Sequence, residues 1–184
     1  MKNIRTLLIF AMIFVVLALL LYVQSKQAPS VIVATPTVGQ SVAQLFPDLT
    51  LDEIQAVQLN SPETGKTFTI SRAADGSWTA PINPGKLSQI ASNDIAKTMV
   101  LLPFSQTMML KPGDDKSSYG FTPKGVLQIE IILTNGVSHA VEIGYRTPTQ
   151  DGYYALVDDL PNLYLMERPA IDYLISTLRS PPVA

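Results

Sequence analysis

The sequence contains a single histidine, His139, and no cysteine. Serine-type nucleophilic catalysis needs a base beside the nucleophile and a carboxylate that orients the base. Ser138 precedes His139, but neighbours on a strand point to opposite faces of a sheet, so the two cannot work together. Without cysteine there is no thiolate catalysis or disulfide, and a zinc site would need several carboxylates beside the one histidine. We interpret His139 as a packed or rim side chain, with a role as ligand or base as the alternative.

Two acidic pairs could also carry chemistry: Asp114–Asp115 and Asp158–Asp159. Paired carboxylates bind Ca²⁺ or act as general acid and base. Neither pair has the spacing of a calcium-binding loop, so we interpret both as solvated acids that form turns. A glycosidase-type pair stays open as an alternative, because such carboxylates are paired in space. Since no phosphate-binding or hydrolase nucleophile motif occurs either, we expect no catalytic residue, no cofactor and no metal.

Aromatic side chains are concentrated in the second half of the chain. Tyrosines that are exposed together can form a partner surface or a platform for a sugar ring. The candidates for such a surface are Tyr145, Tyr153, Tyr154 and Tyr164. Packing in the core is the alternative use of the same side chains.

The most apolar segment is residues 7–23, which contain no charge and no proline. As a helix this segment nearly matches the ~30 Å hydrocarbon core of a bilayer. It predicts an N-terminal transmembrane anchor in contact with the lipid bilayer; a cleaved signal peptide and a buried core helix are the alternatives. The side chains expected to form the anchor are Leu7, Phe10, Phe14, Leu17, Leu21 and Val23.

The distribution of charged residues predicts the orientation of the chain in the membrane and excludes one class of partner. Lys2 and Arg5 precede the apolar segment and only Lys26 follows closely, which predicts a cytoplasmic N-terminus and an extracytoplasmic remainder in a single-pass cell-membrane protein. Thirteen basic residues less these three leave ten, against fifteen acidic residues, so the remainder has a net charge of −5. An acidic domain does not suit phosphate backbones, and we expect no binding to nucleic acid.

The chain is expected to have three parts: a transmembrane anchor at 1–27, an extracytoplasmic linker at 28–44 and an α+β domain at 45–180. Pro29 and Pro36 disfavour helix and central strand in the linker. In the domain, alternating and helical periodicity predicts an antiparallel sheet with two main helices. The expected strands are 56–60, 66–72, 77–80, 126–133, 137–143, 152–157 and 163–166, and the expected helices are 86–102 and 168–179. In the first helix the expected apolar stripe is Leu87, Ala91, Ile95, Met99 and Leu102 with Ile90 beside it, and Ser92 is expected on the polar side. Strands are followed by a helix in both halves, which suggests two similar units.

The hairpin around Asn135–Gly136 has a predictable register. A three-residue loop at 134–136, with Gly136 in a left-handed position, pairs Leu133 with Val137 and Ile131 with His139. This register gives one coherent apolar face, whereas a two-residue loop would mix apolar and charged residues. We therefore predict the three-residue loop.

Short motifs along 45–178 resemble the membrane-anchored domain-of-unknown-function family 4340. They are LFPDLTLDEIQAVQL at 45–59, FTISRAADGSWTA at 68–80, LLPF at 101–104, YGF at 119–121, EIG at 142–144 and DGYYALV at 151–157. The resemblance implies a non-catalytic extracytoplasmic domain on one transmembrane helix, of the auxiliary, ABC-transporter-associated type. It implies no catalytic residues.

These observations predict a non-enzymatic accessory or scaffold subunit that docks on a larger membrane protein complex. An envelope module that binds a carbohydrate or peptide and serves a transporter is the alternative. An envelope hydrolase is a third possibility, which would require acids with raised pKa clustered in a cleft.

Overall fold

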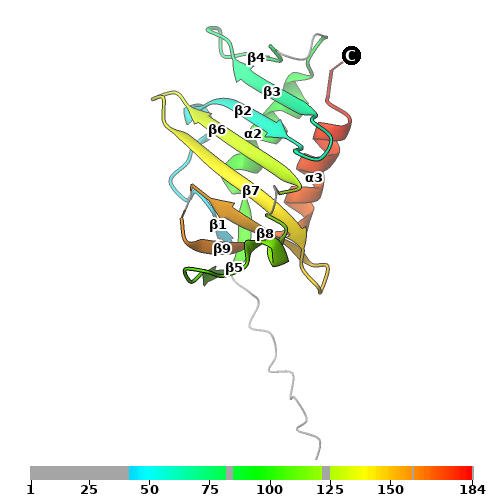
Figure 1. Ribbon diagram of the computed structural model, residues 1–184. Helices are drawn as coiled ribbons and strands as arrows, with labels where there is room; N and C mark the ends of the chain where they lie inside the picture. Colours follow the sequence, from blue (N-terminus) through cyan, green and yellow to red (C-terminus); the bar gives the residue numbers. More distant parts are fainter. Residues whose placement is uncertain (1–41, 82–84, 122–124, 159, 184) are drawn as a thin grey trace, which may run out of the picture. The chain divides into compact units, whose positions relative to one another are not determined.

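The computed structural model describes residues 42–81, 85–121, 125–158 and 160–183. These residues form a nine-stranded, fully antiparallel sheet with two α-helices, as the α+β prediction required (Figure 1). The strands are β1 (Ala43–Gln44), β2 (Ile54–Asn60), β3 (Thr67–Arg72), β4 (Trp78–Thr79), β5 (Pro103–Met109), β6 (Leu127–Leu133), β7 (Ser138–Arg146), β8 (Gly152–Val157) and β9 (Asn162–Glu167). The helices are α2 (Gln89–Leu101) and α3 (Arg168–Arg179), with short 3₁₀ turns η1 (Leu51–Glu53) and η2 (Lys116–Tyr119).

The strand order across the sheet is β1-β5-β9-β8-β7-β6-β2-β3-β4. Short turns connect the neighbours β2–β3–β4 and β6–β7–β8–β9. The pairings of β2 with β6 and of β5 with β9 join segments that lie far apart in the sequence. In chain order, α2 follows β2–β4 and α3 follows β6–β9, and a relationship between the two halves stays a prediction.

The β6–β7 hairpin has the predicted register. Ile131 faces His139, and the Leu133 amide donates to the Val137 carbonyl at 2.8 Å. Gly136 has φ +84°, a left-handed conformation that glycine adopts without a steric cost. The three-residue loop is therefore confirmed, and the apolar face of the hairpin turns toward the core.

Both helices lie on the same face of the sheet (Figure 1). The main core lies between the helices and the sheet. It includes Leu59, Ile129 and Ile143 from the strands, with Met99 of α2 and Leu174 of α3. A smaller cluster of Leu110, Phe121 and Leu163 lies apart from this core. Leu163 is the neighbour of Tyr164 in β9 and points to the other side, so this cluster partly covers the open face of the sheet.

Helix α3 has the predicted bounds, with Pro169 in its first turn and Ile171, Leu174 and Leu178 buried. Helix α2 differs from the prediction. It begins at Gln89, behind the N-cap Ser88, and buries Ser92, Ile95, Ala96 and Met99.

The apolar stripe expected on α2 was therefore partly wrong. Ile90 was assigned to the buried side and is 78% exposed, whereas Ser92 was assigned to the wet side and is fully buried. Residues four apart on a helix advance by about 400°, so a stripe with this spacing drifts away from a straight buried face. Ser92 can be buried because its hydroxyl donates to the Ser88 carbonyl at 2.8 Å.

The domain begins earlier than predicted. Ala43 and Gln44, assigned to the linker, form β1 and pair with Phe104 and Pro103 at the start of β5. The predicted anchor at residues 7–23 and the linker up to residue 41 lie outside the described residues. In the part of the chain that the structure describes, no helix has the length and apolar character needed to cross a membrane.

Candidate functional site

His139 makes its principal polar contact with an acid that follows β8. Its Nδ1 lies 2.6 Å from Oδ2 of Asp158, and its ring lies 4.7 Å from the Phe46 ring, centre to centre. The other Asp158 oxygen accepts the Ala140 amide at 2.7 Å. The structure thus places His139 at the rim of the sheet, where it joins segments of the fold. The sequence analysis did not predict the contact between His139 and Asp158. Pairing β7 with β8 so that Val141 faces Val157 would have placed Asp158 near His139.

Asp114 and Asp115 form turns, as interpreted from the sequence. Asp114 accepts the Lys111 amide at 2.8 Å, and Asp115 caps η2 by accepting the Ser117 amide at 2.9 Å. The hydrogen bonds from Ser117 lower the pKa of Asp115. Asp159 lies outside the described residues. Among residues 42–81, 85–121, 125–158 and 160–183, no three acidic or histidine side chains come close enough to hold a metal ion.

The four tyrosines do not form one exposed surface, which corrects that expectation. Tyr145 is 55% exposed, but Tyr153 is only 4% exposed and belongs to the main core. Tyr154 is half-buried against Tyr119 and packs with the smaller cluster, whereas Tyr164 packs edge-on against Phe104 in the main core. Because neighbours on a strand alternate, these side chains are distributed over both faces of the sheet.

One edge of the sheet is closed at a single residue, Trp78, by a side chain. At β4, the Gln89 amide of α2 accepts the Trp78 backbone N–H at 2.7 Å and donates to the Trp78 carbonyl at 2.7 Å. The glutamine thereby makes both hydrogen bonds that a neighbouring strand residue would make. This edge has no free pairing position at Trp78.

The other edge is largely open. β1 pairs with β5 only at Pro103 and Phe104, and a bulge follows between Phe104 and Gln106. The Leu110 amide donates to the Pro161 carbonyl on the β9 side at 2.7 Å. Because strand backbone groups alternate in direction, Thr107 and Met109 point their N–H and C=O groups away from β9.

The open part of β5 lacks the usual protection of an edge strand. Charged residues and prolines commonly prevent such edges from pairing with other chains. The strand reads PFSQTMM, with no charge and with proline only at its first position. Met108 is 51% exposed and Met109 is 74% exposed. On the side away from β9, residues 105–109 have no strand partner among the described residues.

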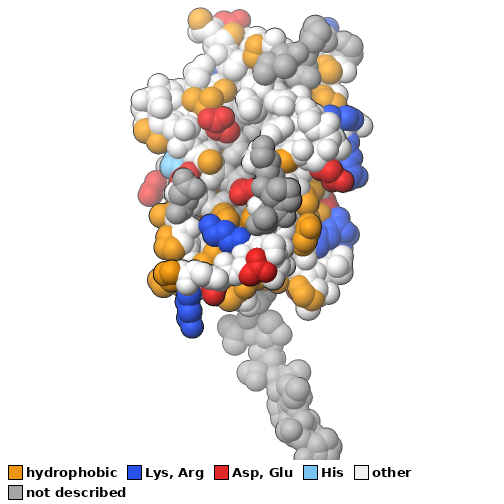
Figure 2. All heavy atoms as spheres, in the orientation of Figure 1, with side chains coloured by type: hydrophobic (Ala, Val, Ile, Leu, Met, Phe, Trp, Pro, Cys, Tyr) orange, Lys and Arg blue, Asp and Glu red, His pale blue; other side chains and the backbone are white. Residues whose placement is uncertain are grey.

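The sheet face opposite the helices has a shallow cavity of about 480 Å³. Figure 2 shows this face, where polar, acidic and apolar side chains are interspersed. Asn60 donates to Gln128 at 3.0 Å across β2 and β6, and Glu142 accepts the Gly125 amide at 2.7 Å. Glu130 also lines the cavity. Amide and carboxylate groups of this kind can hydrogen-bond to hydroxyl-rich ligands.

A second cavity, of about 520 Å³, lies between the last turns of α3 and the ends of the strands; we call it the α3 cleft. Val126, Ile175 and Leu178 contribute apolar walls. Tyr145 and Tyr153 also line it, together with Lys66, Arg146 and Arg179. Basic side chains are gathered along this margin of the molecule in Figure 2.

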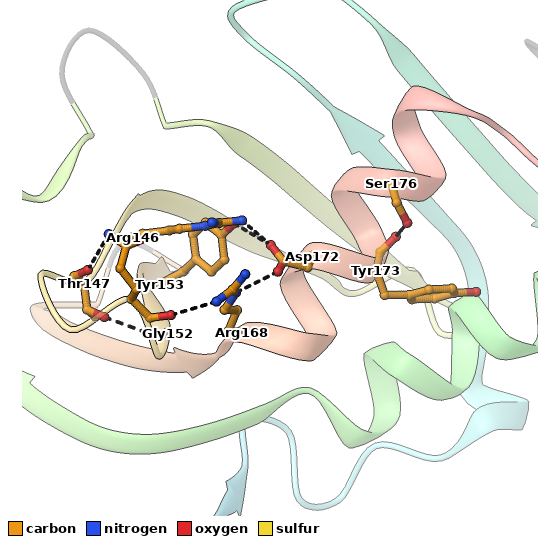
Figure 3. A network of polar contacts seen from close by, with 9 residues as sticks. Arg146, Thr147, Gly152, Tyr153, Arg168, Asp172, Tyr173 and Ser176 are labelled. Atoms are coloured by element: carbon orange, nitrogen blue, oxygen red, sulfur yellow. Dashed lines mark hydrogen bonds and ion pairs between the residues drawn. The ribbon is translucent and has the colours of Figure 1, made fainter.

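A polar network holds Arg146 in place beside the cleft (Figure 3). Its Nε donates to the Tyr153 hydroxyl at 2.7 Å, and its Nη2 donates to Asp172 at 2.8 Å. Tyr153 and Arg168 also donate to Asp172, at 2.7 and 2.9 Å. Burial and the hydrogen bond to Asp172 raise the pKa of Tyr153, so the phenol stays protonated and donates.

Comparisons of the chain with protein families, with curated proteins and with solved structures found no match in any of the three. The resemblance to domain-of-unknown-function family 4340 therefore stays a prediction that rests on the short motifs alone.

Proposed function

We propose that the chain is a non-enzymatic, single-pass membrane-anchored accessory subunit whose extracytoplasmic domain docks on a larger membrane protein complex. Residues 7–23 would supply the anchor and residues 28–41 the spacer. The auxiliary role implied by the family resemblance agrees with this proposal. The domain itself would supply the docking surface.

The observation that supports docking is the open edge of β5. An extended segment of a partner can add to such an edge through backbone hydrogen bonds, with side chains providing specificity. Thr107 and Met109 offer outward backbone groups, and Met108 and Met109 offer exposed, adaptable apolar side chains. Gln89 closes the opposite edge only at Trp78, and β4 pairs only with Ser71 and Arg72 of β3, so Thr67–Ile70 is a second, shorter open segment among the described residues.

Cross-linking of intact membranes, followed by mild-detergent purification and mass spectrometry, tests the proposal. We expect one membrane complex to co-purify, with cross-links from Lys111, the lysine that follows β5. The double variant M108K/M109K should lose the complex, because two charges beside the edge disfavour strand addition.

The matched control is I90K/L101K, which adds the same two charges at exposed positions of α2. This control should retain the complex. Recovery of the native chain alone, without reproducible cross-links, would refute the docking role. Equal behaviour of the two double variants would refute the assignment to β5.

The cavity on the open face favours the second candidate function, a binding module for an envelope carbohydrate. Its amide and carboxylate side chains are groups that can hydrogen-bond to sugar hydroxyls. Calorimetric titration with neutral oligosaccharides tests this alternative. Saturable binding that is lost in Q128A/E130A, but kept in M108K/M109K, would favour it over docking.

A further inference from the structure

The α3 cleft combines a cationic rim with apolar and aromatic walls, and we propose that it binds an amphiphilic anion. The expected ligand carries one carboxylate or phosphate group on a small apolar or aromatic body. Its volume of about 520 Å³ falls in the range of small-molecule sites. This inference is independent of docking at β5.

The charge of the cleft is opposite to that of the rest of the domain. Lys66, Arg146 and Arg179 line it, with Glu63 as the one acid. Asp172 pairs with both Arg146 and Arg168, so these three side chains together keep a net charge of +1. A local excess of positive charge in an acidic domain attracts an anion and disfavours cationic ligands.

Arg146 is already fixed in one orientation. Tyr153 and Asp172 hold its Nε and Nη2, and the guanidinium carbon lies 5.3 Å from the centre of the Tyr153 ring. Among the described residues, Nη1 has no hydrogen-bond partner. The edge formed by Nη1 and Nη2 therefore keeps donors for a carboxylate or phosphate. A side chain that is fixed before binding loses little entropy when the ligand arrives.

Tyr145 supplies an exposed aromatic surface that is supported from behind. An added Cβ at Gly120 would lie 2.5 Å from the Tyr145 ring, so the glycine allows the ring to pack closely against the end of η2. With Ile175 and Leu178 on α3, this ring can accommodate the apolar body of a ligand. A bare inorganic anion would leave these walls unused, which is why we infer an amphiphile.

Titration of the full chain in phosphatidylcholine nanodiscs tests the inference. The probes are phenyl phosphate, inorganic phosphate and phenol, followed by ligand-observed NMR and calorimetry. Phenyl phosphate should bind saturably and more tightly than either of its parts. K66Q/R179Q should weaken it about fivefold to tenfold, since exposed charge pairs contribute modestly to binding.

The matched control is K86Q/K97Q, which removes two basic charges away from the cleft and should leave the affinity unchanged. R146K keeps the charge but loses the planar fork, so it should also weaken binding; far-UV circular dichroism confirms that it folds. Absence of saturable binding, equal affinity for phenol and phenyl phosphate, or an equal loss in the control would overturn the inference.

A change of the nanodisc lipid then shows whether the natural anion is a lipid headgroup or a water-soluble molecule. In nanodiscs that contain phosphatidylglycerol, a cleft that accepts lipid headgroups should show a lower apparent affinity for phenyl phosphate. Unchanged affinity would assign the cleft to a water-soluble anion. Either result can be interpreted only after saturable binding of phenyl phosphate has been measured in phosphatidylcholine nanodiscs.

Discussion

Nδ1 of His139 lies 2.6 Å from Oδ2 of Asp158, although 19 residues separate them in the chain. The second oxygen of Asp158 accepts the Ala140 amide, and the Asp158 amide donates to the Ala140 carbonyl. The Phe46 ring packs against the histidine ring, with 4.7 Å between the ring centres. One carboxylate thus ties the segment after β8 to β7, and the only histidine of the chain links both to the segment after β1.

Replacement of Asp158 by alanine should destabilise the domain by about 1–2 kcal/mol. The variant loses a hydrogen bond to the Ala140 amide and the contact with His139, and partial exposure reduces the effect of both. Thermal unfolding followed by circular dichroism measures the change. Asp158→Asn is the control, because asparagine keeps an acceptor and tolerates φ +48°. An alanine variant as stable as the native chain would contradict the structural role of the pair.

Two glycines should differ in how they tolerate alanine. A Cβ at Gly144 would collide with the backbone carbonyl of Tyr119, whereas a Cβ at Gly136 would meet open space. We expect G144A to cost about 2–3 kcal/mol through overpacking and G136A about 1 kcal/mol through its left-handed φ. Urea unfolding midpoints give the comparison. A larger effect at Gly136 would show that the turn conformation outweighs the steric conflict in β7.

The Asp172 network should stabilise the fold only above strongly acidic pH. Partial burial alone would raise the pKa of Asp172, but hydrogen bonds from Tyr153, Arg168 and Arg146 lower it below its ordinary value. The folded state therefore binds protons less readily than the unfolded state. The resulting stabilisation is present above about pH 4 and disappears as the pH falls through the lowered pKa.

The measurement is the difference in free energy of unfolding between the native chain and D172N across pH. We expect about 1 kcal/mol at pH 7, because the carboxylate is about one-third exposed, and almost none near pH 2. D94N, an equivalent change on the surface of α2, serves as the control. A difference that persists unchanged in acid would mean that packing, and not charge, is responsible.

Replacement of Gln89 should loosen the closed edge of the sheet. Q89A loses both hydrogen bonds to Trp78, and Q89E keeps the acceptor but cannot donate to the Trp78 carbonyl. Each variant should cost about 1–2 kcal/mol. Trp78 is the only tryptophan, so its fluorescence reports directly on this edge. Native-like emission and stability in both variants would show that β4 does not need the glutamine.

Elements defined by local signals were predictable. Helix α3 follows from its apolar spacing and Pro169, and the β6–β7 register follows from Gly136 and the alternation of Ile129 and Ile131. The Asn-Gly turn has few alternative geometries, which is why even the residue pairing could be derived.

Features that depend on distant segments were not predictable. β5 does not alternate between apolar and polar residues, since Ser105–Thr107 are polar and two methionines follow, so its sequence does not show which face is buried or that β9 is its partner. The burial of Tyr153 depends on Asp172, which lies 19 residues away on α3. The displaced face of α2 depends on the sheet beneath it, and the α3 cleft brings together five separate stretches of chain.

The pairing of β5 with β9 has a consequence for biosynthesis. β5 is made well before β9, and β1 covers only its first two residues. A nascent chain therefore carries a methionine-rich, uncharged strand without its main partner until the ribosome has added the last strand. Such segments aggregate readily when they are exposed during folding. Chains truncated before Asn162 should consequently depend on chaperones far more than the full-length protein does.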